Sequence, residues 1–128
     1  MLEKVIQNEI MNFLAECNIF CWKNASVGIF DKKIGQFRAP KSRYQIKGVS
    51  DILGIMPDGR FLAIEVKTKV GKPTPEQMKF ITAINGMGGV AFISRSTEQT
   101  YDQLEKFWPE IQKYRNVLRR FIVYGVCQ

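Results

Sequence analysis

The hydrophobic positions of residues 2–17 recur every three to four residues, which is the spacing of one face of an α-helix. A short apolar run over 19–23 predicts a strand directly after this helix. Between 24 and 47 the pattern is broken by glycine and proline, which indicates irregular strands joined by basic loops. We therefore expect an amphipathic helix, one strand and a long irregular connection.

Two further apolar runs, 51–56 and 61–68, lie on either side of the segment 57–59 (PDG) and predict a β-hairpin. Proline suits the second position of a type I turn, and glycine supplies the left-handed residue that follows such a turn. A three-residue loop of this kind, closed by a bulge, sets Met56 opposite Arg60.

Two capping sequences each predict the start of a helix. The segment 74–77 (TPEQ) combines an N-cap threonine, a proline in the first turn and a capping-box glutamine, and it predicts a helix that ends near Gly86. The run 89–94 then predicts a strand. The segment 96–99 (STEQ) repeats the capping pattern and predicts a helix to about Phe107.

The order of helix, strand, hairpin, helix, strand and helix is typical of an α/β domain with a mixed central β-sheet flanked by helices. A chain of 128 residues with 45% hydrophobic content can bury one core, so we expect a single domain over 1–128 with its core at about 3–100. Residues 111–126 fit either a helix or a helix followed by a strand. The segment 109–128 is left without an assigned role.

The hairpin register brings two acids together. Counting back from Met56 and Arg60, opposed residue numbers sum to 116, which places Asp51 opposite Glu65. Directly opposed residues have their Cβ atoms about 4.5–5.5 Å apart, so two carboxylates there repel each other unless a cation lies between them. A two-residue turn at 58–59 would instead shift the register by one and turn Asp51 to the opposite face.

Paired carboxylates at this separation suit a hard divalent ion such as Mg²⁺ or Mn²⁺. Lys67 lies on the same strand face as Glu65, where its ammonium could orient a water or neutralise developing charge. These groups fit metal-dependent phosphodiester hydrolysis. An isolated Glu-x-Lys pair is more often a solvated ion pair, and it is the opposed Asp51 that favours a catalytic site.

The amino-acid composition limits the possible partners and catalytic groups. Nineteen Lys and Arg against twelve Asp and Glu give a net charge of +7, which favours polyanionic partners. The chain has no histidine, so Ser-His-Asp and Cys-His nucleophiles are excluded and a base must be a carboxylate, a lysine or a metal-bound water. Three cysteines without paired spacing indicate reduced packing residues. No apolar stretch is long enough for a membrane span or a leader, so we expect a soluble, cytoplasmic protein.

The basic residues are concentrated in two segments that contain no acid. One covers 32–50 and the other runs from Ile111 to the end. Their basic residues are Lys32, Lys33, Arg38, Lys41, Arg43 and Lys47 in the first, and Lys113, Arg115, Arg119 and Arg120 in the second. Solubilising surface charge is the alternative to nucleic-acid binding, and the separation of the two signs favours binding.

Three segments carry a resemblance to a known family. The sequences at 48–54 (GVSDILG), 61–67 (FLAIEVK) and 71–77 (GKPTPEQ) resemble motifs of the VRR-NUC branch of the PD-(D/E)XK nuclease superfamily. The resemblance covers roughly 3–100 and implies a restriction-endonuclease-like core in the order αβββαβα. It also implies a divalent-metal-dependent endodeoxyribonuclease. Ser50 stands where the superfamily usually has proline, a change that affects the backbone rather than the chemistry.

The resemblance also implies roles for single residues. Asp51 and Glu65 would bind the metal, and the backbone carbonyl of Val66 would add a ligand. Lys67 would assist the nucleophile, and Gln77 would support the site.

The family's site also includes a glutamate on the first helix. Glu3 fits that spacing best, and Glu9 is the alternative.

Small members of this branch resemble enzymes that resolve four-way DNA junctions as homodimers, which implies branched DNA and a second copy as partners. An aromatic cluster of Phe107, Trp108 and Tyr114 could supply the interface or could belong to the core. The candidates for phosphate contact are Trp22, Lys23, Arg43, Lys47, Lys69, Lys72 and Arg95. Nuclease action on ordinary duplex or flap DNA, and DNA binding without catalysis, are the alternative functions.

Overall fold

The computed structural model describes residues 2–25, 29–38 and 44–123 of the chain. Eleven elements follow one another in the described residues: α1 (Glu3–Glu16), β1 (Phe20–Lys23), β2 (Ile29–Asp31), β3 (Gln36–Arg38), β4 (Ile52–Ile55), β5 (Phe61–Val66), α2 (Pro75–Gly86), β6 (Val90–Ser94), α3 (Thr97–Phe107), the 3-10 helix η1 (Pro109–Tyr114) and α4 (Arg115–Val123). Apart from β2 and β3, these elements up to α3 follow the predicted order αβββαβα.

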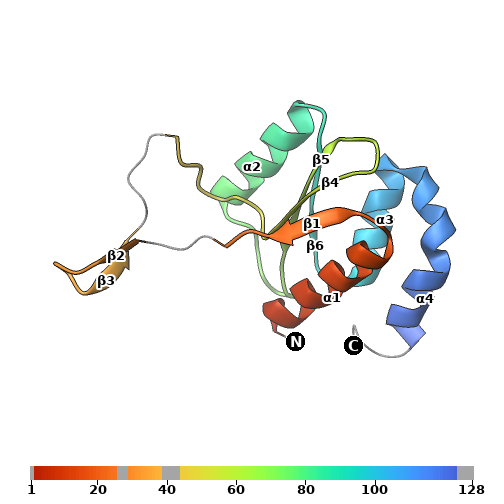
Figure 1. The fold of residues 1–128 in the computed structure, drawn as a ribbon, viewed down its shortest axis with the longest axis horizontal. Coiled ribbons are helices and arrows are strands. Elements are labelled where there is room, and N and C mark those ends of the chain that lie inside the picture. Colours follow the sequence, from red (N-terminus) through yellow and green to blue (C-terminus); the bar gives the residue numbers. More distant parts are fainter. Residues whose placement is uncertain (1, 26–28, 39–43, 124–128) are drawn as a thin grey trace.

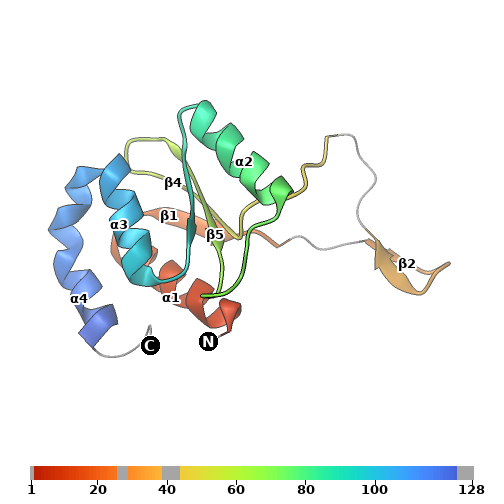
Figure 2. The ribbon, with the colours of Figure 1, turned by 180° about the vertical axis from the view of Figure 1, so that it is seen from behind.

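Four strands form a mixed sheet in the order β1-β4-β5-β6, in which β5 and β6 run parallel and the other pairs antiparallel (Figure 1). Strands β2 and β3 form a separate antiparallel hairpin, drawn apart from this sheet in Figures 1 and 2. The expected α/β class with a mixed central sheet flanked by helices is confirmed.

The larger core lies between one face of the sheet and the helices α1, α3 and α4. Leu62, Ile64 and Val66 alternate along β5 with the residues of the other face and are fully buried in this core. From α1, Phe13 packs edge-on against Phe121 of α4, with ring centroids 5.7 Å apart. Helix α1 forms because its apolar residues fall on one side, which this core covers.

Helix α2 covers the opposite face over β5 and β6. Its contact rests on a small cluster in which Ile81 packs against Ala63 and Ala91. Alanine on both strands lets the helix approach closely. The acidic residues of the hairpin project from this same face, because Glu65 is two residues beyond Ala63 on β5.

The turn between β4 and β5 has the predicted form. The Met56 amide donates to the Arg60 carbonyl at 2.8 Å, and the Gly59 amide donates to the Met56 carbonyl at 2.8 Å. Gly59 has φ +92°, the left-handed conformation expected of it. The paired residues run from Ile55 opposite Phe61 to Ile52 opposite Ile64, so the predicted register is confirmed and the shifted alternative is wrong.

The C-terminal segment, which the sequence left undecided, is helical as far as the structure describes it, and residues 124–128 lie outside the described part. Trp108 is 5% exposed and packs against Tyr114 with ring centroids 6.2 Å apart. The core alternative therefore holds for the aromatic cluster, and Trp108 is not available as an interface residue. Lys113 lies over both rings, and Arg120 pairs with Glu16 at 2.9 Å.

None of the helices in the described part of the chain is long and apolar enough to cross a membrane. Cys17 and Cys21 are free thiols, and Cys127 lies outside the described residues. Burial raises the pKa of the Cys17 thiol to about 12, with a smaller contribution from the nearby Glu16 charge. Cys17 is thus a protonated packing residue, as its sequence context indicated.

Candidate active site

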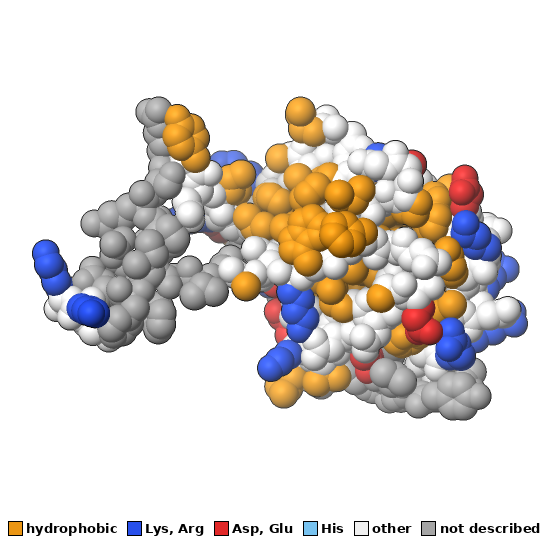
Figure 3. Space-filling model, in the orientation of Figure 1, with side chains coloured by type: hydrophobic (Ala, Val, Ile, Leu, Met, Phe, Trp, Pro, Cys, Tyr) orange, Lys and Arg blue, Asp and Glu red, His pale blue; other side chains and the backbone are white. Residues whose placement is uncertain are grey.

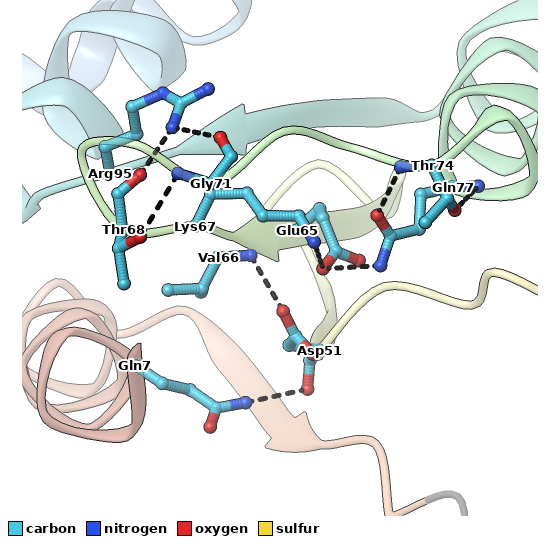
Figure 4. A network of polar contacts seen from close by, with 10 residues as sticks. All are labelled: Gln7, Asp51, Glu65, Val66, Lys67, Thr68, Gly71, Thr74, Gln77 and Arg95. Atoms are coloured by element: carbon cyan, nitrogen blue, oxygen red, sulfur yellow. Dashed lines mark hydrogen bonds and ion pairs between the residues drawn. The ribbon is translucent and has the colours of Figure 1, made fainter. Parts of the chain in front are cut away.

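Asp51 lies one residue before β4 and directs its carboxyl group toward β5. The Val66 amide donates to Asp51 Oδ2 at 2.8 Å (Figure 4). The Asp51 main-chain carbonyl accepts from the Asn24 amide at 2.8 Å and from Gln7 Nε2 at 3.5 Å. The loop before β4 is therefore tied to β1, to β5 and to the first helix.

Glu65 is part of β5, lies beside the Asp51 side chain and is only 1% exposed. Its Oε2 accepts a hydrogen bond from Gln77 Nε2 at 3.1 Å and lies 3.7 Å from Lys67 Nζ (Figure 4). Its Oε1 is buried and has no hydrogen-bond partner. A buried carboxylate oxygen without a protein partner is costly, and a bound cation would satisfy it.

The electrostatics of the pair also favour a positive charge beside it. The pKa of Glu65 is raised from 4.5 to about 8. Burial is the largest cause, followed by the neighbouring Asp51 carboxyl group, while the Lys67 ammonium opposes the shift and the charge of Glu3 adds to it. One lysine does not compensate two facing carboxylates, so the pair is short of positive charge.

Gln77 joins the start of α2 to this pair. Its Oε1 accepts from the Thr74 amide at 2.8 Å, and Thr74 Oγ1 accepts from the Gln77 amide at 3.1 Å, which completes the predicted capping box. The remaining amide nitrogen is the one that reaches Glu65. The capping bond thus fixes the orientation of the side chain that contacts the carboxylate, and the two roles foreseen for Gln77 coexist.

Gly48 sets the distance between the Asp51 loop and α2. It has φ +80°, and a Cβ built on it would lie 2.4 Å from the carbonyl carbon of Glu76 and 2.6 Å from the Gln77 nitrogen. The backbone before Asp51 therefore lies directly against the peptide that carries Gln77. A glycine is required here both by its conformation and by the space.

The direction of the Val66 carbonyl follows from the hydrogen bond of the next residue. The Lys67 amide donates to the Ser94 carbonyl on β6 at 3.0 Å. In a trans peptide the C=O and the following N–H point in opposite directions, so the Val66 carbonyl points away from β6 and toward the side on which Asp51 lies. This main-chain oxygen and the Asp51 carboxyl group therefore lie on the same side of β5.

The first-helix acid is less closely placed. Glu3 is exposed at the start of α1, and its charge contributes to the raised pKa of Glu65. Glu9 is buried on the same helix, with 6% exposure. Among the described residues, no three Asp, Glu, Cys or His side chains come close enough together to hold a metal by themselves. Asp51 and Glu65 thus form a carboxylate pair that Glu3 does not join as a third member.

These residues fit a hard divalent cation. The ligands on offer are carboxylate oxygens of Asp51 and Glu65 and the carbonyl of Val66, which is the all-oxygen set that Mg²⁺ and similar ions prefer. The unpartnered Oε1 and the surplus negative charge are the two features that such an ion would satisfy. Few protein ligands leave room for water and phosphate oxygens in the remaining positions.

Arg95 is turned toward the loop that follows β5. Its Nη1 donates to the carbonyls of Thr68 and Gly71, the latter at 2.6 Å (Figure 4). Thr68 Oγ1 in turn accepts from the Gly71 amide at 3.2 Å. This guanidinium therefore fixes the loop that begins directly after Lys67 and carries Lys69 and Lys72, a role that its side chain's position in the sequence did not suggest.

Five of the other predicted phosphate contacts lie in the described part of the chain. Lys47, Lys69 and Lys72 are exposed on the loops that lead into and out of it. Lys23 is exposed at the end of β1, where Nζ donates to Asn8 Oδ1 of α1. Trp22 is 39% exposed on the sheet face that carries Asp51 and Glu65, and Arg43 lies outside the described residues.

Gln7 and the backbone role of Gly48 were not anticipated as site features. Gln7 sits one helical turn after Glu3 and reaches the main chain of Asp51. The sequence shows only that Gln7 is a polar residue beside the apolar stripe of α1. Ordinary surface residues of a helix share this feature. Gly48 was noted within a family motif, but the contact that requires a glycine is between segments distant in sequence.

Comparison with known proteins places the chain in a family. The model of the VRR-NUC domain matches residues 3–98, so the chain belongs to the VRR-NUC domain family, a family of nucleases. A solved structure described as a VRR_NUC domain protein is similar to it with a TM-score of 0.54, over 91% of this chain and 90% of that chain, at 18% sequence identity. That likeness concerns the fold. A search of curated proteins finds no match.

The raised pKa of Glu65 has a consequence for stability. Its pKa in the folded protein, about 8, exceeds the value of 4.5 expected in the unfolded chain, so between these values the folded state holds a proton that the unfolded state has released. In metal-free protein the free energy of unfolding is therefore expected to fall as pH rises from about 5 to 8, by at most about 1.4 kcal/mol per pH unit. Denaturant unfolding with a chelator at each pH measures this.

The Glu65→Gln variant is the reference for that measurement, because it removes the Glu65 carboxyl group and leaves the other side chains unchanged. The difference in unfolding free energy between wild type and variant should slope across this window. Parallel curves for the two proteins would contradict the prediction.

Proposed function

We propose that the chain is an endonuclease that cleaves branched DNA such as four-way junctions, with Mg²⁺ or Mn²⁺ as cofactor and a homodimer as the working form. The observation that carries the nuclease chemistry is the carboxylate pair of half-buried Asp51 and buried Glu65, with the unpartnered Oε1 of Glu65 and Lys67 Nζ beside them. Membership of the VRR-NUC family supports the same chemistry.

Each residue has a distinct task in this proposal. Asp51, Glu65 and the Val66 carbonyl hold the cation, which when bound would polarise a phosphate oxygen and lower the pKa of a coordinated water. Lys67 presents a compact ammonium, 12% exposed, that can orient the attacking water or neutralise charge on the phosphoryl group. Gln77 holds the Glu65 carboxylate in place through a bond that the capping box preorients.

The contact with DNA is expected to be mainly electrostatic. Lys69 and Lys72 lie on the loop held by Arg95, and Lys47 lies on the loop that enters the site from the other side. Phosphate contacts of this kind position a nucleic acid without reading its sequence, which suits selection by branch shape. A symmetric junction requires two symmetric cuts, which is the reason for proposing two copies.

A cleavage panel tests the proposal. A synthetic four-way junction, a flap and a linear duplex of matched sequence are incubated with the full chain, with Mg²⁺, with Mn²⁺ or with a chelator. We expect metal-dependent cleavage that is fastest on the junction, and we expect Asp51→Ala and Lys67→Ala to abolish cleavage while junction binding persists.

Other outcomes would reassign the function. Equal cleavage of all three substrates would indicate a nuclease for ordinary duplex or flap DNA. Junction binding with no cleavage under any metal, and no thermal stabilisation by Mn²⁺, would indicate a DNA-binding module instead. Measuring Mn²⁺ stabilisation of the protein without DNA separates a missing metal site from an unsuitable substrate.

A further inference from the structure

One half of a sheet face is covered by none of the helices in the described part of the chain. Helix α2 packs on β5 and β6, whereas Phe20 and Trp22 of β1 and Ile55 of β4 are exposed on the same side by 68%, 39% and 41%. Phe61, at the start of β5, is 37% exposed, and Leu53 between them is half-buried. Figure 3 shows hydrophobic side chains gathered over β1 in the middle of this view. We call these five residues the β1–β4 patch.

Strand pairing arranges the patch in two rows. Trp22 is opposite Leu53, and in the next row Phe20 is opposite Ile55, which is opposite Phe61. Opposed residues project to one face, so both rows lie on the face that also carries Asp51. The rings of Phe20 and Trp22 are 5.6 Å apart and form one surface. The patch is thus an extension of the active-site face toward the free edge of the sheet.

We propose that the β1–β4 patch binds the same patch of a second copy of this chain, and so forms the interface of the homodimer. The inference deepens the proposed function, on which it rests for the existence of a dimer, and it locates the partner. DNA is the less suitable occupant, because protein surfaces that bind DNA are polar and basic and the five patch residues include no charged or hydrogen-bonding group except the Trp22 indole.

Charge also favours a second copy at this place. Two copies that each carry +7 repel each other, and they can approach most easily through surfaces without lysine or arginine. At the margin of the patch, Arg60 is already paired with Asp58 at 2.7 Å. The patch is therefore an uncharged surface on a strongly basic protein.

The two ends of the longer row differ in shape. Phe20, the most exposed of the five, stands at one end of its row. Beside Phe61 at the other end lies a recess of about 390 Å³, lined by Ile84 and Met87 on one side and by the ion pair of Asp58 and Arg60 on the other. A two-fold axis along β4 near Ile55 exchanges the two ends, so Phe20 of each copy would enter the recess of the other. Contacts in which one residue meets another and the reverse also holds are the mark of a two-fold interface.

The size of the patch suits the hydrophobic core of an interface. Large side chains bury about 150–250 Å² each, so the exposed fractions of the four most exposed residues amount to on the order of 400 Å². A stable interface takes about 800 Å² from each partner, and the patch would supply its apolar centre while the recess walls and margins supply the rest.

Sedimentation of the full chain tests the proposal. Ile55→Lys would place two ammonium groups together at the two-fold axis, and Phe20→Lys would remove the side chain that fills the recess. Met78→Lys is the matched control, because Met78 is also 41% exposed but lies on α2 outside the patch. We expect wild type and Met78→Lys to sediment as two chains and the two patch variants as one, all with unchanged circular dichroism.

A wild-type protein that sediments as one chain, or an Ile55→Lys protein that remains a dimer, would overturn the inference. An Ile55→Cys variant adds an independent readout, since the same axis predicts an oxidative cross-link between copies that wild type does not form. If wild type sediments as one chain and the two patch variants bind the junction more weakly than wild type, the patch is a DNA-binding surface instead. A wild-type dimer that dissociates with Ile55→Lys but cleaves no DNA would support the interface and refute the proposed function.

Discussion

Glu65→Gln is expected to abolish DNA cleavage and at the same time to leave the metal-free protein as stable as wild type or more stable. Gln keeps the shape of the side chain and can still accept from Gln77, but it has no negative charge for a cation. Loss of groups that merely support a metal ligand costs about 10- to 100-fold, so loss of a ligand itself should cost more than about 100-fold in cleavage rate.

The stability half of this prediction follows from burial. Glu65 is 1% exposed and faces Asp51, so its ionised form is costly in the absence of a cation. At pH 9 the wild-type side chain is ionised. There we expect the free energy of unfolding of Glu65→Gln to exceed that of wild type by roughly 1–3 kcal/mol. At pH 4, where both are neutral, the two proteins should be similar. Denaturant unfolding with a chelator and single-turnover cleavage with Mn²⁺ measure the two effects.

Glu110→Gln is the matched control for the same chemical change, because Glu110 is an exposed acid on η1 that contacts none of the site residues named above. It should retain wild-type cleavage and Mn²⁺ stabilisation. Robust cutting by the Glu65→Gln protein would show that this carboxylate is not part of the catalytic machinery. A stability loss without any change in cleavage would instead mark Glu65 as a structural residue.

The part of the site that sequence could predict is the part that local chemistry determines. The segment 57–59 fixes the turn type, the turn fixes the register, and the register sets Asp51 beside Glu65. The capping box at Thr74 likewise places Gln77 at the start of its helix. In each case the residues involved are near in sequence, so their conformational preferences decide the result.

Features that depend on contacts between distant segments were not predictable in this way. The capping sequence at 96–99 predicts a helix start, but it does not show what the preceding residue contacts. Arg95 donates to carbonyls of the loop after β5, which are 24 to 27 residues earlier in the chain. The burial of Trp108 depends on how η1 returns against α3. The β1–β4 patch also has no local signal, because it exists only where α2 fails to cover two strands. Such features belong to the tertiary arrangement rather than to propensity.

Gly48→Ala is expected to damage both stability and cleavage, because the new methyl group has no space. Its carbon would lie 2.4 Å from the Glu76 carbonyl carbon, and φ of +80° is unfavourable for any L side chain. Strain of about 1–2 kcal/mol and overpacking of about 1–3 kcal/mol together predict a loss of roughly 2–5 kcal/mol in the free energy of unfolding.

The effect on cleavage follows from what must move. Relief of the clash requires the Glu76–Gln77 peptide to separate from the Asp51 loop, which withdraws the Gln77 amide from Glu65. Loss of such a supporting hydrogen bond predicts a cleavage rate lower by about 10- to 100-fold. The rate is measured by single-turnover junction cleavage at a temperature where the variant is shown to be folded.

Other glycines of the same chain separate the two causes. Gly59 has φ +92° with no atom within 4 Å of an added Cβ, so Gly59→Ala should cost only the strain of about 1–2 kcal/mol and leave cleavage unchanged. Gly86 has neither strain nor a close neighbour, so Gly86→Ala should be neutral or slightly stabilising. If Gly48→Ala behaved like Gly59→Ala in both measurements, the close approach of the Asp51 loop to α2 would not be what positions Gln77.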